Sequence, residues 1–496
     1  MDRNEILERV SNRTCAWDIV VIGGGATGVG CALDAAARGY DVLLLEQHDF
    51  GKGTSSRSTK LVHGGVRYLE QGNISLVRES LQERGILMQN APHVVHKQAF
   101  VVPCYSNFRK LYYAIGLKFY DLMSGKYSFG RSRILSRAET TELLPTIVKR
   151  GLVGGILYYD GQFDDTRLLN DLVATAAVNG AAMINYSRVS SLSKNAAGKM
   201  AGVEFSDLFS GKTFSVKAKV VINATGAFCD ALRSLSEPAA KPIITMSQGI
   251  HLVFGGRFLP TKSAVLIPKT SDGRVLFCIP WLGSTLIGTT DTPVDSAELE
   301  PHALEAEIDF VLKTASDYLE PKPTRNDIMS VFAGIRPLVK NAGARNTASL
   351  SRGHMIEIDD AGLLTITGGK WTTYRRMAED AVDQAARSGG LPERTSVTAS
   401  LAINAWTESY ETAGEQLHPD LPYTRDDVVR AVGSEMAQTV EDVLARRTRA
   451  LFINARAAVE MSPQVAAIMA SELGKDDVWI DAQLKEFRAT AKSYMI

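Results

Sequence analysis

Three positively charged residues stand in loop contexts from which a side chain can project into a cleft. Arg67 closely follows a Gly-Gly pair, Arg336 precedes a proline, and Lys370 follows a second Gly-Gly pair. An arginine can bind a phosphate through two parallel hydrogen bonds, and a lysine supplies a compact charge. The chain has 55 Lys and Arg against 55 Asp and Glu, so its overall field favours neither nucleic acid nor an acidic partner. An anionic substrate would therefore depend on local cations such as these.

Two of the eight histidines stand where they could serve a reaction. His251 lies in the middle of an apolar strand pattern, and His63 precedes two glycines. An imidazole with an ordinary pKa near 6.5 can accept a proton at neutral pH. The neighbours of His251 favour a hydrogen-bonded core histidine at least as much as a catalytic base, and His63 is the rival for that role. No cluster of carboxylates indicates a metal, so none is expected.

The elements that must position these residues begin with a nucleotide-binding unit. A continuous apolar run at 18–22 predicts a parallel strand buried on both faces, and a helix is expected over 26–38. Between them, Gly23, Gly25 and Gly28 have the spacing that allows a tight turn, close approach of a pyrophosphate and close helix packing. Ala26 and Thr27 begin the helix, whose N-terminus attracts phosphates. A second strand ends at Glu46, which is placed to bind ribose hydroxyls. We predict dinucleotide binding, although the unit alone does not distinguish FAD from NAD.

Two later segments favour a flavin. One predicted strand ends in Ala224-Thr225-Gly226, and another runs through Gly368-Gly369-Lys370 into a helix over 372–387. This combination resembles flavoproteins of the D-amino-acid-oxidase type, in which the last helix points its N-terminus at the flavin pyrimidine. The resemblance implies FAD as cofactor, bound in part by Ala224, Thr225, Gly226, Gly368, Gly369, Lys370, Thr372 and Thr373. Ordinary strands of a nucleotide-binding sheet are the alternative.

A longer stretch narrows the resemblance. Residues 53–70, GTSSRSTKLVHGGVRYLE, closely resemble the T-S-S-x-x-S/T-K-L-x-H-G-G-x-R-Y-L-E stretch of FAD-dependent glycerol-3-phosphate dehydrogenases. Further matches follow in the family order: 247–253, 287–291, 332–338 and 368–375. A run as specific as H-G-G-V-R-Y-L-E, joined to G-I-R-P-L and G-G-K-W-T-T-Y-R, is hard to obtain by chance.

The resemblance implies a reaction and roles for the residues above. The reaction is oxidation of sn-glycerol 3-phosphate to dihydroxyacetone phosphate by hydride transfer to FAD, with electrons passed on to a quinone. Arg67, Tyr68 and Lys370 would help to hold the substrate. Arg336 would lie beside the reacting oxygen, His251 would be the base, and His63 would lie on the flavin side. The polar loop that follows the second strand would contact the FAD pyrophosphate and ring; a solvated loop is the alternative. The cofactor-binding residues expected in this loop and directly after it are Thr54, Ser55, Ser56, Thr59, Lys60, His63, Gly64 and Gly65.

The same resemblance implies an α/β fold of three parts. A Rossmann-like FAD-binding domain would be interleaved with an antiparallel-sheet substrate domain, and an all-helical domain would follow. The expected boundaries are 1–90, 151–239 and 340–392 for the first, 91–150 and 240–339 for the second, and 393–496 for the third. In the substrate domain, the pattern predicts two strands around the turn Ser271-Asp272-Gly273 and an amphipathic helix over 305–318.

The helical part carries four arginines on a helix predicted over 440–458: Arg446, Arg447, Arg449 and Arg456. They could contact anionic lipid or dock onto the main body. A solvated face whose charges are paired within the chain is the favoured interpretation.

The segment 108–126 mixes aromatic and aliphatic residues with lysines and an arginine, a composition that suits a bilayer interface. A core helix of the substrate domain is an equal alternative. No stretch reaches the ~18 uncharged apolar residues of a spanning helix, and the first ten residues lack the apolar run of a secretory signal. Five scattered cysteines indicate free thiols in a reducing compartment. We expect a cytoplasmic protein that lies peripherally on the inner face of the cell membrane; whether it is a homodimer stays open.

Other functions fit the same motifs less well. A glycerol-3-phosphate oxidase would share the site and use dioxygen as acceptor. A flavin-dependent amine or amino-acid oxidase of the same fold is more distant, because Arg67 and Lys370 suit a phosphate. A flavin-binding protein without catalysis is disfavoured by the complete set of basic and proton-accepting residues.

Overall fold

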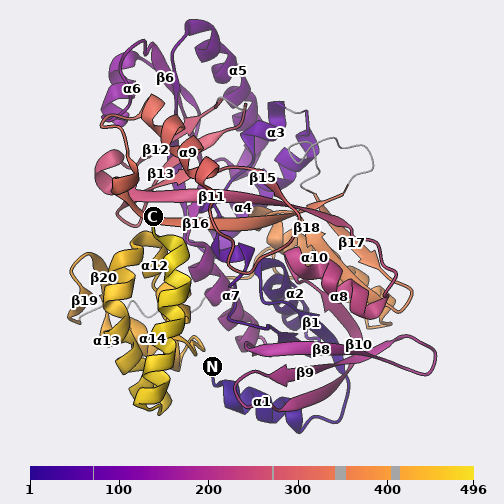
Figure 1. Ribbon diagram of the computed structural model, residues 1–496. Helices are drawn as coiled ribbons and strands as arrows, with labels where there is room; N and C mark the ends of the chain where they lie inside the picture. The colour runs from indigo at the N-terminus through magenta and orange to yellow at the C-terminus, as the bar shows by residue number, and fades with distance from the viewer. Residues whose placement is uncertain (71, 271–272, 341–352, 404–413) are drawn as a thin grey trace.

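Figure 1 shows the computed structural model, in which two sheets lie one above the other and the C-terminal helices lie to one side. The structure describes residues 1–70, 72–270, 273–340, 353–403 and 414–496, without the side chains of Arg67 and Glu70. The predicted turn at Ser271 and Asp272 lies outside these residues. None of the described helices has both the length and the apolarity needed to cross a bilayer.

The first sheet has the strand order β17-β18-β10-β1-β2-β7. At its centre four strands run parallel: β1 (Trp17–Ile22), β2 (Val42–Leu45), β10 (Thr213–Asn223) and β18 (Leu363–Gly368). Ile22 pairs with Leu45 on one side and with Asn223 on the other, and Asn223 pairs with Thr365. The carboxyl ends of all four strands therefore meet at one edge. The remaining strands are β7 (Ala182–Ile184), β8 (Ser187–Lys194), β9 (Met200–Asp207) and β17 (His354–Ile358).

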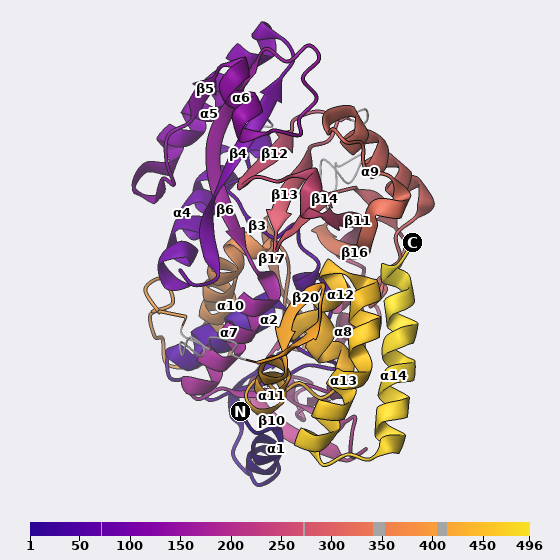
Figure 2. The same cartoon turned by 90° about the vertical axis from the view of Figure 1, so that its left-hand side faces the viewer.

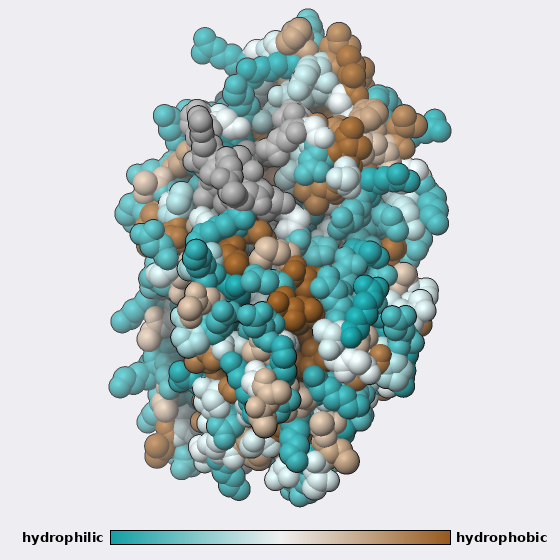
Figure 3. Space-filling view, turned by 90° about the vertical axis from the view of Figure 1, so that its right-hand side faces the viewer, coloured by the Kyte–Doolittle hydropathy of each residue, from teal (hydrophilic) through white to brown (hydrophobic). Residues whose placement is uncertain are grey.

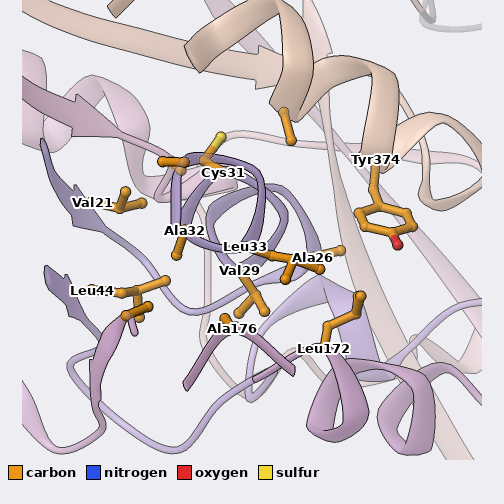
Figure 4. Packing of buried hydrophobic residues seen from close by; sticks show 14 of the residues in the cluster. Val21, Ala26, Val29, Cys31, Ala32, Leu33, Leu44, Leu172, Ala176 and Tyr374 are labelled. Carbon is orange, nitrogen blue, oxygen red and sulfur yellow. The ribbon is translucent and has the colours of Figure 1, made fainter. Parts of the chain in front are cut away.

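Helix α2 (Ala26–Ala37) is enclosed by the sheet, by α7 (Asp165–Val178) and by α10 (Tyr374–Ser388). Figure 4 shows side chains from all three neighbours around it: Val21 and Leu44 of the sheet, Leu172 and Ala176 of α7, and Tyr374 of α10. The helix is made mostly of small residues because its neighbours lie so close. A Cβ atom added to Gly28 would come within 1.9 Å of the carbonyl oxygen of Gly23.

The second sheet has the order β15-β11-β14-β13-β12-β4-β6-β3, with β16 beside β11 and β5 beside β6. It is antiparallel except where β12 meets β4. Its strands are β3 (Leu61–Val62), β4 (Val95–Cys104), β5 (Arg133–Leu135), β6 (Gly154–Phe163), β11 (Ile244–Gly255), β12 (Ser263–Ile267), β13 (Leu276–Trp281), β14 (Ser284–Gly288), β15 (Thr292–Val294) and β16 (Ile328–Val339). Strands β3 and β6 fall in segments expected in the first domain, but their pairing puts them in this sheet, because β6 lies along the full length of β4.

Helices cover both sheets. The predicted helix over 305–318 is confirmed as α9 (Glu305–Tyr318). The other α-helices of the two sheet regions are α1 (Arg3–Ser11), α3 (Val66–Glu70), α4 (Ile74–Asn90), α5 (Asn107–Ser124), α6 (Arg137–Leu143) and α8 (Cys229–Ser236). The 3-10 turns are η1 (Thr54–Ser56), η2 (Gly125–Tyr127), η3 (Gly226–Phe228), η4 (Gly256–Phe258), η5 (Arg325–Asp327), η7 (Trp371–Thr373) and η9 (Lys492–Tyr494).

The C-terminal part is largely helical, and Figure 2 shows its helices in yellow beside the first sheet region. Its elements are the hairpin β19 (Gln416–His418) and β20 (Leu421–Thr424), α11 (Arg425–Gly433), the π-helical turn η8 (Asp442–Arg447), α12 (Ala450–Ile453), α13 (Ala455–Leu473) and α14 (Asp477–Ala491). The hairpin was not expected. The single helix predicted over 440–458 is also wrong: Arg449 adopts a left-handed conformation at φ 65°, and Asn454 caps a new helix. Arg446, Arg447 and Arg449 are paired, as expected, but buried rather than solvated.

The contact between Gly28 and Gly23 gives a prediction for stability. Gly28→Ala should destabilise the protein by about 3 kcal/mol, because the new methyl group meets backbone that cannot rotate away. Gly433→Ala is the matched control, since a Cβ atom there meets nothing within 4 Å and its effect should stay within about 0.5 kcal/mol. The urea midpoint, followed by circular dichroism, measures both. Equal midpoints for the two variants would contradict this account of the packing.

Candidate active site

The edge where the four parallel strands end has the groups needed to hold a dinucleotide. Gly25, which precedes α2, has no side chain to cap the helix, and the N–H of Ala26 instead donates to Ser55 Oγ at 2.9 Å at this edge. Unpaired N–H groups and the positive end of the helix dipole favour a phosphate there. A Cβ atom at Gly25 would come within 3.1 Å of Ser55 Oγ, so a larger residue there would crowd the Ser55 hydroxyl. The residues thus fit an FAD pyrophosphate in the predicted position.

Glu46 follows β2 at the same edge and is fixed by backbone groups. Its carboxylate accepts hydrogen bonds from the N–H of Gly24 at 2.6 Å and of His48 at 2.8 Å. Burial raises the pKa of Glu46, and these two N–H groups oppose that rise. A carboxylate held in this way beside the α2 N-terminus suits a ribose diol.

The polar loop after β2 packs against the start of α2. Ser55 Oγ accepts a hydrogen bond from the N–H of Ala26 at 2.9 Å, and its carbonyl accepts one from the Trp371 indole at 2.8 Å. Thr54 Oγ1 donates to the carbonyl of Ile335 at 2.5 Å. The loop therefore joins the start of α2 to the start of α10 and to strand β16.

Lys60 turns its side chain away from this loop and into the protein. Its ammonium group is fully buried and donates to the carbonyl of Ser56 at 2.8 Å and to Asp165 at 2.6 Å. Burial, then Arg449, lowers the pKa of Lys60 to about 7, while Asp165 raises it. Its predicted contact with FAD stays a prediction, and the ammonium already has internal partners.

The ends of β10 and β18 bring the remaining predicted cofactor residues to the edge. Thr225 Oγ1 donates to Asn223 at 2.7 Å, just before Gly226. Gly368 and Gly369 both have positive φ, 79° and 68°, a conformation that favours glycine. Thr373 lies in η7 one turn further on, where its hydroxyl donates to the carbonyl of Lys370 at 3.2 Å.

The His63–Gly65 segment is held between η7 and β6. The N–H of His63 donates to Thr372 Oγ1 at 3.2 Å, and the N–H of Gly64 donates to Asp160 at 3.2 Å. Asp160 is buried and also accepts from Arg84 at 2.7 Å and from Tyr120 at 2.8 Å. No sequence motif singled out Asp160, which lies mid-strand in β6.

A cavity of about 550 Å³ lies next to this segment. Its polar lining includes Thr59, His63, Tyr68, Asp160, Arg274, Thr289, Asp291 and Arg336. The Lys370 ammonium lies 4.7 Å from the centre of the Tyr68 ring. Tyr68 and Arg336 thus line one cavity, and Lys370 lies against Tyr68. Arg67 lies in α3 directly before Tyr68, and its side chain lies outside the described part of the chain.

Arg336 is oriented by the loop after β14. It donates to Thr289 Oγ1 at 2.9 Å and to the carbonyl of Thr290 at 3.1 Å, and it lies 3.7 Å from Asp291. A Cβ atom at Gly249 would come within 2.2 Å of its Nη2 atom, so the guanidinium occupies space that only glycine leaves. Thr289 and Asp291 were not predicted as site residues, although the I-G-T-T-D match marked the segment.

His251 lies behind the cavity lining rather than in it. Its ring stacks on Phe332, its cross-strand neighbour on β16, with ring centres 4.9 Å apart. Nε2 is 2.9 Å from Thr59 Oγ1, and Thr59 lines the cavity. Burial, then Lys60 and Arg336, lowers the pKa of His251 well below 6.5, so the ring is neutral at pH 7. A neutral imidazole can accept a proton, and its assignment as the base stays a prediction.

Two family models match the chain. One, described as FAD dependent oxidoreductase, matches residues 18–375. The other, described as the C-terminal domain of alpha-glycerophosphate oxidase, matches residues 367–479. Together they account for both sheet regions and most of the helical part.

Curated relatives and solved structures agree with these models. The mitochondrial glycerol-3-phosphate dehydrogenase of Arabidopsis thaliana is 40% identical over 96% of this chain and 86% of its own, and the human one is 39% identical over 96% and 73%. The glycerol-3-phosphate dehydrogenase of Bacillus halodurans, solved in complex with FAD, has a TM-score of 0.79 at 30% identity and covers 99% of this chain and 97% of its own. The chain belongs to the family of FAD-dependent glycerol-3-phosphate dehydrogenases, and FAD is its cofactor.

Proposed function

We propose that the protein oxidises sn-glycerol 3-phosphate to dihydroxyacetone phosphate and passes the electrons through FAD to a quinone at a membrane surface. One observation carries this proposal: a single cavity is polar beside His63 and Arg336 and apolar where it reaches helix α5. The polar end suits a small phosphoester, and the apolar end suits a lipid-soluble acceptor. The substrate agrees with the names of the relatives above.

At the polar end of the cavity, we assign separate roles to the residues that would bind the phosphate and to the residue that would face the reacting hydroxyl. Lys370 and Tyr68, with Arg67 beside them in the chain, would hold the phosphate dianion. Arg336, fixed by Thr289 and Asp291, would face the reacting hydroxyl and stabilise alkoxide character as the O–H bond breaks. FAD, when bound, would accept the hydride from the substrate carbon that carries the reacting hydroxyl.

The proton of the substrate hydroxyl needs an acceptor. His251 is neutral at pH 7, and the hydroxyl of Thr59 links its Nε2 atom to the cavity. We assign His251 as the base, reached through Thr59 or directly after a small movement of the ring. His63 would then orient the flavin side of the site, where its N–H bonds to Thr372 at the start of α10.

Helix α5 presents an apolar face to solvent beside the cavity. The face repeats at helical spacing, and its exposed members are Phe108, Leu111, Tyr112, Ile115, Phe119 and Leu122. Figure 3 shows hydrophobic surface gathered toward the upper end of the molecule, where α5 lies in Figure 1. Tyr112, Ile115 and Phe119 also line the cavity, so the cavity reaches this face.

Exposed Arg109, Lys118 and Lys126 lie on and just after the same helix. Cations beside an exposed aromatic and aliphatic face favour the surface of a bilayer with anionic lipids. We therefore propose peripheral membrane binding through α5, which would place the open end of the cavity where a quinone dissolves. The expected location on the cytoplasmic face of the cell membrane stays a prediction, and the curated relatives named above are mitochondrial by name.

Dioxygen is the alternative acceptor. The L-alpha-glycerophosphate oxidase of Mycoplasma pneumoniae, solved with FAD bound, shares the fold with a TM-score of 0.61 at 19% identity over 77% of this chain and 97% of its own. The apolar face of α5 at the cavity favours the quinone.

An anaerobic flavin experiment tests substrate and acceptor together. The yellow holoprotein should bleach with sn-glycerol 3-phosphate and not with its enantiomer. A water-soluble quinone should then restore the colour faster than air does. Reoxidation by air at the higher rate would support the oxidase instead, and absence of bleaching would refute the proposed substrate.

Arg336→Ala and Lys370→Ala should retain FAD yet slow bleaching by the substrate at least about a hundredfold, because a fixed cation is lost from the reacting oxygen or the phosphate. Arg257→Ala is the control: Arg257 is exposed, lies in the same sheet region and pairs with Asp327 away from the cavity. Stopped-flow absorbance of the flavin measures the rates. Near-normal bleaching in both site variants would refute these assignments.

Phe108→Glu combined with Leu122→Glu should abolish binding to anionic vesicles, because two carboxylates replace the most exposed apolar side chains of α5. Bleaching by the substrate should persist, since neither residue lines the cavity. Val478→Glu is the matched control, a 75% exposed apolar residue on α14. Vesicle sedimentation measures binding, and unchanged sedimentation of the double variant would contradict a membrane role for α5.

A further inference from the structure

The loop that follows β2 is tied to the C-terminal domain by a buried ionic contact. The Asp49 carboxylate is fully buried and receives four hydrogen bonds: from Arg446 Nε at 2.6 Å, Arg447 Nη1 at 2.7 Å, Arg447 Nη2 at 2.8 Å and Asn185 Nδ2 at 3.4 Å. Burial alone would raise the pKa of Asp49, but the two arginines hold it well below its ordinary value. The carboxylate is therefore charged at neutral pH and held from two directions.

Two further contacts join the same partners. Lys52 donates to both carboxylate oxygens of Glu441, at 2.9 and 2.7 Å. Arg449 donates to the carbonyl of Ser56 at 2.9 Å. Positions 49, 52 and 56 of the loop are thus held by a C-terminal segment that spans only residues 441–449.

The backbone of that segment is unusual in a way that serves these contacts. Residues 442–447 form a π-helical turn, and π-turns are often found at functional sites. Arg449 has φ 65°, a strained conformation for a residue other than glycine, yet its side chain is 2% exposed and bonded to the carbonyls of Ala445 and Ser56. The π-helical turn and the left-handed conformation of Arg449 together direct the side chains of Arg446, Arg447 and Arg449 toward the loop that follows β2.

The held loop is the one that borders the cofactor site. It begins directly after Glu46, and it contains Ser55, whose hydroxyl bonds to the first N–H of α2. Ser55 lies between Lys52 and Ser56, both of which are held from the C-terminal side. Opening this loop would uncover the α2 N-terminus, where the pyrophosphate of FAD binds in this fold.

We propose that the C-terminal domain is a clamp on the FAD-binding loop, and that Asp49 with Arg446 and Arg447 are positioning residues that control how long FAD is retained. The proposal rests on FAD as cofactor and is independent of the substrate and the electron acceptor.

Removing the charge of Asp49 should loosen the clamp without unfolding the C-terminal domain. Arg446 also pairs with Glu441 and Asp442, each at 2.7 Å, and Arg447 also donates to the carbonyl of Glu435 at 2.8 Å. The arginines therefore keep partners within their own domain, whereas the contact to the loop loses its charge.

Asp49→Asn in the holoprotein should release FAD at least about tenfold faster than the wild type, because buried cations face a neutral amide. Free flavin fluoresces more strongly than the bound form, so the rise in fluorescence after dilution measures release. The matched control is Asp34→Asn. Asp34 is equally buried and pairs with Arg38 at 2.6 Å, but it lies near the opposite end of α2 from the phosphate site. Circular dichroism at the same temperature reports whether each variant is folded.

Release from folded Asp49→Asn at the rate of the Asp34→Asn control would overturn the proposal. If Asp49→Asn does not fold, Lys52→Met decides, since Lys52 lies at the rim of the contact with 16% of its side chain exposed. Its control is Lys219→Met, an exposed lysine paired with Asp18 at 2.7 Å, far from the loop. Lys52→Met should release FAD severalfold faster than Lys219→Met, and equal rates would overturn the clamp.

Discussion

The parallel alignment of β1, β2, β10 and β18 is the constraint on which the rest of the molecule depends. β10 pairs in register with β1 on one side and with β18 on the other, although these three strands are far apart in the chain, so the segments after Ile22, Leu45, Asn223 and Gly368 reach one edge. Backbone N–H groups, a carboxylate and two helix N-termini then converge at this edge. Because this edge is built from backbone, its shape depends on close packing, which is why Gly28 tolerates no Cβ atom against Gly23.

A second alignment, that of β11 with β16, sets the reacting end of the site. Gly249 and Gly334 face each other in this pair, and each leaves room for an arginine: Arg336 beside Gly249 and Arg57 beside Gly334. The same register places His251 against Phe332, two residues further along. One pairing of strands therefore fixes the cation and the imidazole relative to each other, and the loop after β14 completes the orientation of Arg336.

The sequence predicted the elements whose signals are local. The strand–glycine–helix unit of residues 17–46 and helix α9 were found where expected, because apolar periodicity and glycine spacing are read over a short window. The partners of buried charges were not predictable in this way. From the sequence, Arg447 is expected at the surface. In the structure it is buried because Asp49, 398 positions away in the chain, supplies a buried carboxylate partner. Likewise, β6 belongs to the second sheet because it pairs with β4, and the residue pattern within 154–163 does not predict this pairing.

The electrostatics of the reacting end follow from the same burial. Burial, then Lys60 and Arg336, lowers the pKa of His251, so these surroundings disfavour a proton on the imidazole. Under the proposed function, a phosphate dianion held beside Lys370 would offset part of this positive field and raise the proton affinity of His251 again. The pKa of His251 would then rise when the substrate binds. Proton transfer to His251 could therefore occur while Lys60 and Arg336 stay in place. Carboxylates balance both cations: Asp165 is paired with Lys60, and Asp291, which lines the cavity, is near Arg336.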